Sequence, residues 1–164
     1  MKKKILIIAG ILLLCLLYFC LFPIKYNIDR ECEASLLNTD STGEGQKLTV
    51  KIKGKYSFYL FQPDTFRGTI EIEGFPETSG EVTLRFDHGT ANLVYHHWDR
   101  YELHSQSFGL ISANFGLKDF IILKEDTTAG IDLSGNGLYA IISKNMDIAD
   151  VEAFRLKLLE EMQR

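Results

Sequence analysis

Histidines are the side chains whose type and spacing first suggest chemistry in this sequence. All four of them, His88, His96, His97 and His104, fall in one stretch that contains YHHWDRYELH. A zinc site needs three or four ligands that converge on one ion, and His96 and His104 are the candidates for it. Because neighbours in a regular strand point to opposite faces, His96 and His97 cannot both face one ion. The pattern therefore favours a polar strand end and loop over a zinc site.

The segment DLSGNG is a second candidate for metal binding. Asp132, Ser134 and Asn136 place oxygen atoms at alternate positions, and Gly137 turns the chain, as at the opening of a calcium loop. The twelfth position of such a loop is Ser143 here, whereas the loop needs a bidentate glutamate. We therefore interpret the segment as a glycine-rich turn between strands, and expect no metal and no cofactor.

Motifs of common hydrolases and nucleotide-binding proteins are absent from the sequence, including G-x-S-x-G, H-E-x-x-H and G-x-x-x-x-G-K-[ST]. Glutamates occur at Glu71, Glu73, Glu77 and Glu81, but strand alternation puts the first two on the solvent face. Cys32 lies in a polar segment rather than in a pocket, which disfavours a nucleophile. The sequence thus predicts no catalytic residue and favours a protein that is not an enzyme.

The segments that must position these side chains show the period-two pattern of half-buried strands. In KLTVKIK, Leu48, Val50 and Ile52 alternate with polar residues, and Gly54-Lys55 predicts a tight turn. The same alternation recurs over residues 69–73, 82–87 and 91–97. Residues 120–123 and 138–142 are continuously apolar, which is typical of strands covered on both faces.

The C-terminal segment changes to a helical period. Asp147 is a good N-cap, with Asp150 three residues on. The apolar positions that follow at helical spacing are Ile148, Val151, Phe154, Leu158 and Met162. Burying this stripe against a sheet predicts an α+β domain of mostly antiparallel strands with one C-terminal amphipathic helix.

The N-terminal segment KKKILIIAGILLLCLLYFCLFPIK carries no charge from Ile5 to Phe22. As a helix this run would be about 27 Å long, close to a hydrocarbon core of about 30 Å. Signal peptides have shorter apolar regions and a small-residue cleavage site, and the bulky residues before Pro23 provide none. The sequence predicts an uncleaved signal-anchor, with a cleaved signal peptide as the alternative. Lys2 and its lysine neighbours place the N-terminus in the cytoplasm.

The expected organisation follows from these segments. We predict a cytoplasmic tail over residues 1–4, a transmembrane helix over 5–22, a polar stalk over 23–46 and an extracytoplasmic α+β domain over 47–164. The protein would then be a single-pass cell-membrane protein with its C-terminal domain outside.

Charge and cysteine content restrict the partners. Residues 24–164 carry 15 Lys+Arg and 22 Asp+Glu, a net charge of −7 without a basic cluster, which disfavours nucleic-acid binding. Cys15 and Cys20 lie in the apolar run, so Cys32 has no partner in the predicted outer domain. A homodimer linked through Cys32 is therefore a further hypothesis.

The stretch YLFQPDTFRGTIEIEGF contains the pattern L-F-x-x-D-x-F-x-G-x-I-x-I-x-G. Its matching positions are Leu60, Phe61, Asp64, Phe66, Gly68, Ile70, Ile72 and Gly74. In this stretch the chain resembles an uncharacterised family of small single-pass membrane-anchored proteins of Gram-positive bacteria. The resemblance implies the same order of span, strands and terminal helix, but brings no catalytic residue. The motif itself predicts a turn at Pro63-Asp64 with Phe66 packed inward.

Aromatic residues are concentrated in the hairpin that contains this motif, where they are Tyr56, Phe58, Tyr59, Phe61 and Phe66. Exposed aromatic side chains are typical of binding surfaces. The leading hypothesis is a non-enzymatic membrane protein whose outer domain binds another protein or a cell-envelope component. The alternatives are a cell-envelope enzyme or enzyme subunit with a His/carboxylate site, and an immunity-type protective protein.

Overall fold

The computed structural model describes residues 8, 10–12, 14, 18, 22–38, 45–100, 102–124 and 139–162. Within these residues the chain forms eight strands, two short 3₁₀ helices and a C-terminal α-helix, and the separate described residues 8, 10–12, 14 and 18 are helical as well. In order, the elements are β1 (Ile24–Asn38), β2 (Gln46–Phe58), β3 (Asp64–Ile72), η1 (Pro76–Thr78), β4 (Glu81–Phe86), β5 (Thr90–Asp99), β6 (Glu102–Ala113), η2 (Phe115–Leu117), β7 (Phe120–Lys124), β8 (Tyr139–Ser143) and α2 (Ile148–Met162).

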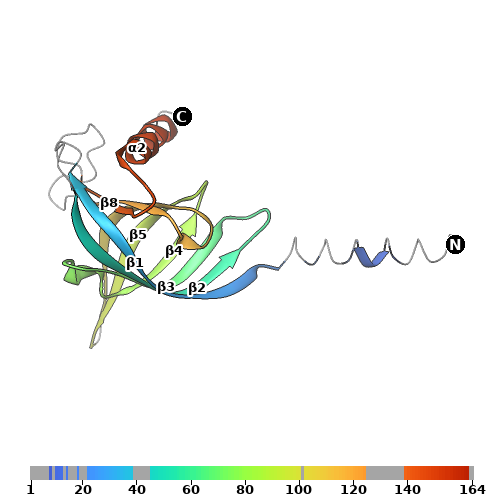
Figure 1. The fold of residues 1–164 in the computed structure, drawn as a ribbon. Coiled ribbons are helices and arrows are strands. Elements are labelled where there is room, and N and C mark those ends of the chain that lie inside the picture. Colours follow the sequence, from blue (N-terminus) through green and yellow to red (C-terminus); the bar gives the residue numbers. More distant parts are fainter. Residues whose placement is uncertain are drawn as a thin grey trace.

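The strands form one closed barrel in which each strand pairs antiparallel with the next (Figure 1). β8 returns to β1 and closes the barrel, with Ala34 in register with Ser143 and Asn38 with Tyr139. α2 lies on the outside of the barrel, next to β8 (Figure 1). This arrangement corrects the predicted fold class. The described chain is a mostly β protein with one C-terminal helix, not an α+β domain that follows a transmembrane helix.

β1 is the strand that the sequence pattern does not predict, because its residues lie within the predicted polar stalk over 23–46. Its buried Ile28 and Ala34 alternate with the exposed Asp29 and Glu31, so the period-two pattern is present. Few of its inward side chains are large and apolar, which weakens the signal. β1 nevertheless pairs with both β2 and β8, and that double pairing closes the barrel.

β2 continues through the tight turn predicted at Gly54-Lys55. Gly54 lies in register with Gly68 of β3. A Cβ on Gly54 would clash with the carbonyl oxygen of Arg67 and would stand 2.8 Å from Cζ of Phe66. The glycine therefore allows a close approach of two strands instead of turning the chain.

The barrel interior is filled by apolar side chains. Val50, Phe66, Ile70 and Leu84 have no exposed surface, and the inward positions predicted for β2, β3 and β4 are confirmed. The β4–β5 connection is a two-residue hairpin turn, because His88 and Gly89 both have positive φ, as type I′ requires.

A second apolar cluster lies between the barrel wall and α2, so that β7 and β8 are covered on both faces, as predicted. Ile122 and Ile141 belong to the barrel interior, whereas Leu123 packs with Phe154 of α2. Asp147 caps the helix, because its Oδ1 accepts the backbone N–H of the two residues Ala149 and Asp150, at 2.9 and 3.1 Å. The predicted C-terminal helix is therefore confirmed.

Among the residues that the structure describes, no helix has both the length and the apolar composition needed to cross a membrane. This finding contradicts the signal-anchor predicted over residues 5–22, and with it the single-pass cell-membrane localisation. Most residues of that run, and the tail over 1–4, lie outside the described residues.

Candidate functional site

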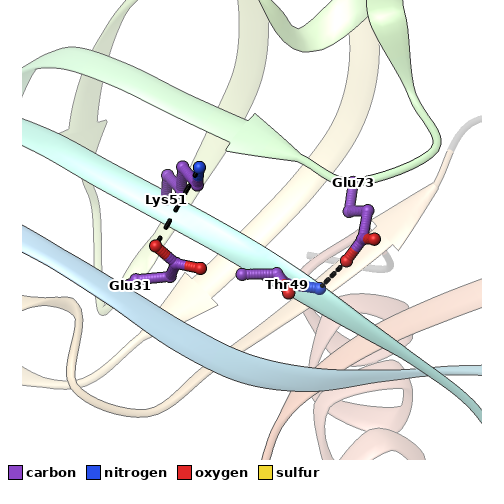
Figure 2. Close-up of polar contacts among 4 residues, drawn as sticks. All are labelled: Glu31, Thr49, Lys51 and Glu73. Atoms are coloured by element: carbon purple, nitrogen blue, oxygen red, sulfur yellow. Dashed lines mark hydrogen bonds and ion pairs between the residues drawn. The ribbon is translucent and has the colours of Figure 1, made fainter.

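Rows of opposite charge lie on the outer face of β1 and β2. Asp29 is in register with Lys53 and Glu31 with Lys51. The Asp29 Oδ2–Lys53 Nζ distance is 3.3 Å. Figure 2 shows the second pair, in which Glu31 Oε2 lies 3.9 Å from Lys51 Nζ. All four side chains are more than half exposed, so water screens the charges and each pair stabilises the fold by roughly 0.2–1 kcal/mol.

A polar depression of about 360 Å³ lies beside these pairs. Its lining residues are Glu31, Thr49, Lys51, Glu71, Ile72 and Glu73. Figure 2 shows Glu73, whose Oε2 accepts the backbone N–H of Thr49 at 2.9 Å. Glu71 and Glu73 are exposed on this face, as predicted.

A further charged contact joins the seam where β8 meets β1. Lys144 Nζ donates a hydrogen bond of 2.8 Å to Glu33 Oε2. This bond, followed by the charge of the lysine, lowers the pKa of Glu33 below its ordinary value. The same bond and the charge of Glu33 raise the pKa of Lys144. Both side chains are exposed, so the pair connects β1 to the residue after β8 at the surface and buries no charge.

Large apolar side chains are exposed around the barrel end where β1 begins. We call this group the apolar end, and its members are Phe22, Ile24, Leu60, Phe61 and Phe115. Phe61 is 77% exposed and Phe115 is 57% exposed. Phe58 connects them, because it is in register with Ile24 and its ring lies 5.2 Å from that of Phe115. Leu60 and Phe61 follow Phe58 in the β2–β3 loop.

η2 holds Phe115 over this end of the barrel. The Phe115 ring lies 5.6 Å from that of Tyr26 and 5.8 Å from that of Tyr56. Gly116 has a φ of 74°, a conformation that favours glycine. A Cβ at Gly116 would lie 2.6 Å from Tyr26 Oη. Arg30 Nη2 donates a 2.6 Å hydrogen bond to the Gly116 carbonyl oxygen, which fixes η2 to β1.

Polar groups lie beneath the Phe115 ring. Tyr56 Oη donates to Asp64 Oδ2 at 2.7 Å, and Asp64 Oδ1 accepts the backbone N–H of Tyr59 at 2.9 Å. Burial, followed by the bond to Asp64 and its charge, raises the pKa of Tyr56. Burial and then Asp64 also raise the pKa of Tyr26, against the opposing charge of Arg30. Both tyrosines therefore stay protonated at neutral pH and can act as hydrogen-bond donors, not as bases.

Two polar atoms in this group have no hydrogen-bond partner among the described residues. They are Tyr26 Oη and Arg30 Nε, and both are shielded from solvent. No sequence pattern predicts Tyr26, Arg30 or Phe115 as site residues. The available signal was Phe115-Gly116, an aromatic residue beside a glycine between two strands, which is a turn signal rather than a chemical one.

The histidines do not converge. His104 is in register with His97, so it faces the opposite side of the β5–β6 hairpin from His96. His96 Nδ1 lies 2.9 Å from Ser105 Oγ, and His97 Nε2 lies 3.0 Å from a carbonyl oxygen of η1. His88 is exposed in the β4–β5 turn. The structure therefore does not bring the zinc candidates His96 and His104 together.

The described residues contain no group of three or more His, Cys, Asp or Glu side chains placed to hold a metal ion. The calcium candidates Asp132, Ser134 and Asn136 lie outside the described residues. Cys32 is half-buried in β1 and packs against the barrel core. A Cys32-linked homodimer stays a prediction, and it would require this side chain to turn out of the barrel wall.

A separate apolar pair lies at the other end of the barrel. The β5–β6 hairpin projects from the barrel wall (Figure 1). In it Trp98, which is 78% exposed, is in register with Leu103, which is 49% exposed. This pair is smaller than the apolar end and lies far along β5 from the β4–β5 turn.

Comparisons with protein-family models, curated proteins and solved structures find no match for this chain. The resemblance of residues 59–75 to membrane-anchored proteins of Gram-positive bacteria therefore stays a prediction.

Proposed function

We propose that this protein is a non-enzymatic binding module that associates with another protein through the apolar end of its barrel. The observation that carries the proposal is the exposure of Phe61 and Phe115, at 77% and 57%, beside Leu60 and Ile24. Exposed apolar surface surrounded by polar residues is typical of protein interfaces. Aromatic side chains in particular are enriched at the centres of such interfaces.

The state of the barrel interior supports binding at the outside. Eight-stranded barrels either fill their interior with side chains or enclose one small ligand. Here the interior positions are occupied by large apolar residues such as Phe66, Leu84 and Tyr95, all essentially without exposed surface. The surface is then the part of the barrel with room for a partner.

The test is capture of partners by crosslinking of the full chain, with Phe61→Ser and Phe115→Ser as variants. Trp98→Ser is the matched control, because Trp98 is as exposed as Phe61 but lies at the other end of the barrel. We expect each variant at the apolar end to lower capture of a defined partner about tenfold, as for the loss of an interface hot spot. The control is expected to leave capture unchanged.

Two results would contradict the proposal. One is unchanged capture by the double variant of Phe61 and Phe115 while circular dichroism shows an intact fold. The other is loss of capture in the Trp98→Ser control alone, which would move the interface to the β5–β6 hairpin.

A further inference from the structure

β1 has a strand partner along one edge but along only part of the other. It pairs with β2 from Ile24 to Leu36, and with β8 only from Ala34 to Asn38. Figure 1 shows β1 continuing past the short β8 toward its own N-terminal end. Within the described ranges, no strand pairs with the second edge of β1 from Ile24 to Glu33. We call this stretch the free edge.

The backbone groups of the free edge can be assigned from one hydrogen bond. The Lys144 N–H donates to the Glu33 carbonyl oxygen at 3.2 Å, so the backbone of Glu33 points to the β8 side. In a strand, the N–H and C=O of alternate residues point to the same edge. The N–H and C=O of Glu31, Asp29 and Asn27 therefore point to the free edge. A strand edge without a pairing partner is a template for another strand.

The two faces beside the free edge differ in chemistry. Asp29 and Glu31 project outward and are exposed, and their contacts with lysines of β2 leave each carboxylate accessible to water. On the inward side, Tyr26 and Phe115 present aromatic rings 5.6 Å apart. A strand added here would meet carboxylates on its outward face and aromatic rings on its inward face.

We propose that the free edge binds an extended peptide segment of a partner protein, added antiparallel to β1, whose residues alternate between basic and apolar. Main-chain hydrogen bonds would supply affinity and the alternating side chains would supply specificity. The basic residues lie opposite Asp29 and Glu31, and the apolar residues lie toward Phe115. This inference rests on the proposed function, because it names the class of partner that meets the apolar end.

Charge favours a foreign strand over a second copy of the protein. Antiparallel pairing of two β1 edges centred on Arg30 would bring Asp29 of one copy opposite Glu31 of the other, and Glu31 opposite Asp29. Like charges directly opposite in a sheet are destabilising, whereas opposite charges are favourable. A homodimer through β1 is therefore the competing outcome of the test rather than the proposal.

The probe is a labelled synthetic peptide of about eight residues that alternates lysine and valine, titrated into the full chain and followed by fluorescence anisotropy. The matched variants are Asn27→Pro and Asn27→Ala. Proline removes the N–H that points to the free edge and is tolerated at sheet edges, whereas alanine keeps it. We expect at least tenfold weaker binding to Asn27→Pro than to Asn27→Ala. Equal binding to both would overturn the proposal.

A second measurement leaves the protein unchanged, in case the proline variant does not fold. In antiparallel addition, the outward-facing lysines of the peptide carry the N–H groups directed at β1. N-methylation of the lysine residues should therefore abolish binding, and N-methylation of the valine residues should preserve it. The reverse order, or equal loss in both peptides, would refute the antiparallel strand.

The charge requirement is tested with a peptide in which glutamate replaces lysine, against the chain and its Asp29→Lys/Glu31→Lys variant. The unchanged chain is expected to bind the basic peptide at least tenfold more tightly than the acidic one, and the variant is expected to reverse this order. An unchanged order in the variant would remove the charge argument. Sedimentation of the chain alone as a dimer that Asn27→Pro dissociates would replace the proposal with the homodimer.

Failure of this inference is distinguishable from failure of the proposed function. If Phe61→Ser lowers partner capture while the affinity for the peptide is the same in Asn27→Pro and Asn27→Ala, the apolar end binds a partner and the free edge does not. If neither variant has an effect, both proposals fail together.

Discussion

Tyr56 and Asp64 are joined across the mouth of the β2–β3 hairpin, where the phenol oxygen lies 2.7 Å from Oδ2 of the carboxylate. The other oxygen of Asp64 accepts the backbone N–H of Tyr59 at 2.9 Å. Asp64, the first residue of β3, thus holds Tyr56 near the end of β2 and Tyr59 just after it, and so positions the loop that presents Phe61. The position of the exposed loop therefore depends on the two hydrogen bonds that Asp64 accepts.

Asp64→Ala should therefore lower the free energy of unfolding by about 2–3 kcal/mol, because two donors lose their acceptor. Tyr56→Phe removes only one of the two bonds and should cost about 1 kcal/mol. Urea denaturation of the two variants measures both values. Equal costs would mean that the bond to the Tyr59 backbone contributes nothing to stability.

Gly116→Ala should be destabilising by more than the strain of its backbone alone. Its φ of 74° costs a residue with a Cβ about 1–2 kcal/mol, and the new methyl group would also press on Tyr26 Oη. Gly74→Ala is the control, because Gly74 has a φ of 83° but open space around it. Thermal or urea unfolding should show the larger loss for Gly116→Ala. A loss no larger than in the control would argue against the contact with Tyr26.

Phe154→Ala should uncouple α2 from the barrel. Phe154 is 5% exposed against β7 and β8, and removing such a ring costs about 3–5 kcal/mol. Leu156→Ala in the same helix is the control, because Leu156 is 55% exposed and surface changes cost within about 0.5 kcal/mol. Hydrogen exchange should show faster exchange of the α2 amides in Phe154→Ala only. Unchanged protection of the α2 amides in Phe154→Ala would mean that contacts other than those of Phe154 hold the helix on the barrel.

Stability should fall at alkaline pH. Burial is the main cause that raises the pKa of Tyr56 and Tyr95 above the ordinary value of 10.0, followed by the bond to Asp64 for Tyr56 and by Glu77 for Tyr95. The unfolded chain then releases these protons first, so the folded state holds more protons above pH 10. The contribution of these two tyrosines to the unfolding free energy is therefore constant below that value and falls above it, by up to about 1.4 kcal/mol per pH unit for each tyrosine.

The measurement is urea denaturation from pH 8 to 11, with the variants Tyr56→Phe and Tyr95→Phe. Each variant should lose part of the alkaline decline. Tyr95→Phe also leaves the Ile70 carbonyl oxygen without the 2.6 Å bond from Tyr95 Oη, so its stability at neutral pH should be lower by about 1 kcal/mol. An identical alkaline decline in both variants and the unchanged chain would assign it to other groups.

The parts of the fold that the sequence predicts are those with a strong local period. Val50 and Ile52 in β2 and Ile70 in β3 alternate with charged residues and are buried as expected. Asp147 marks the start of α2 because a cap is a local signal between neighbouring residues. For the candidate site, the aromatic hairpin is visible in the sequence, and the exposure of Phe61 within it is not.

Pattern alone misleads where the same residue type serves two purposes. Gly54 is predicted as a turn, yet it lies within β2 opposite Gly68. The apolar run from Ile5 to Phe22 predicts a membrane span, and the described residues contain no helix that fits one. Phe115 joins the apolar end only because η2 folds it over Tyr26 and Tyr56.

The sequence by itself determined the faces of β2, β3 and β4 and the position of α2, because side-chain alternation and capping act between near neighbours. Only the tertiary structure decided that the sheet closes, because closure depends on the pairing of the first strand with the last, in which Ala34 lies in register with Ser143. No local period encodes which distant strand a strand will pair with. The same long-range pairing leaves β1 from Ile24 to Glu33 without a second strand partner among the described residues, and so creates the free edge.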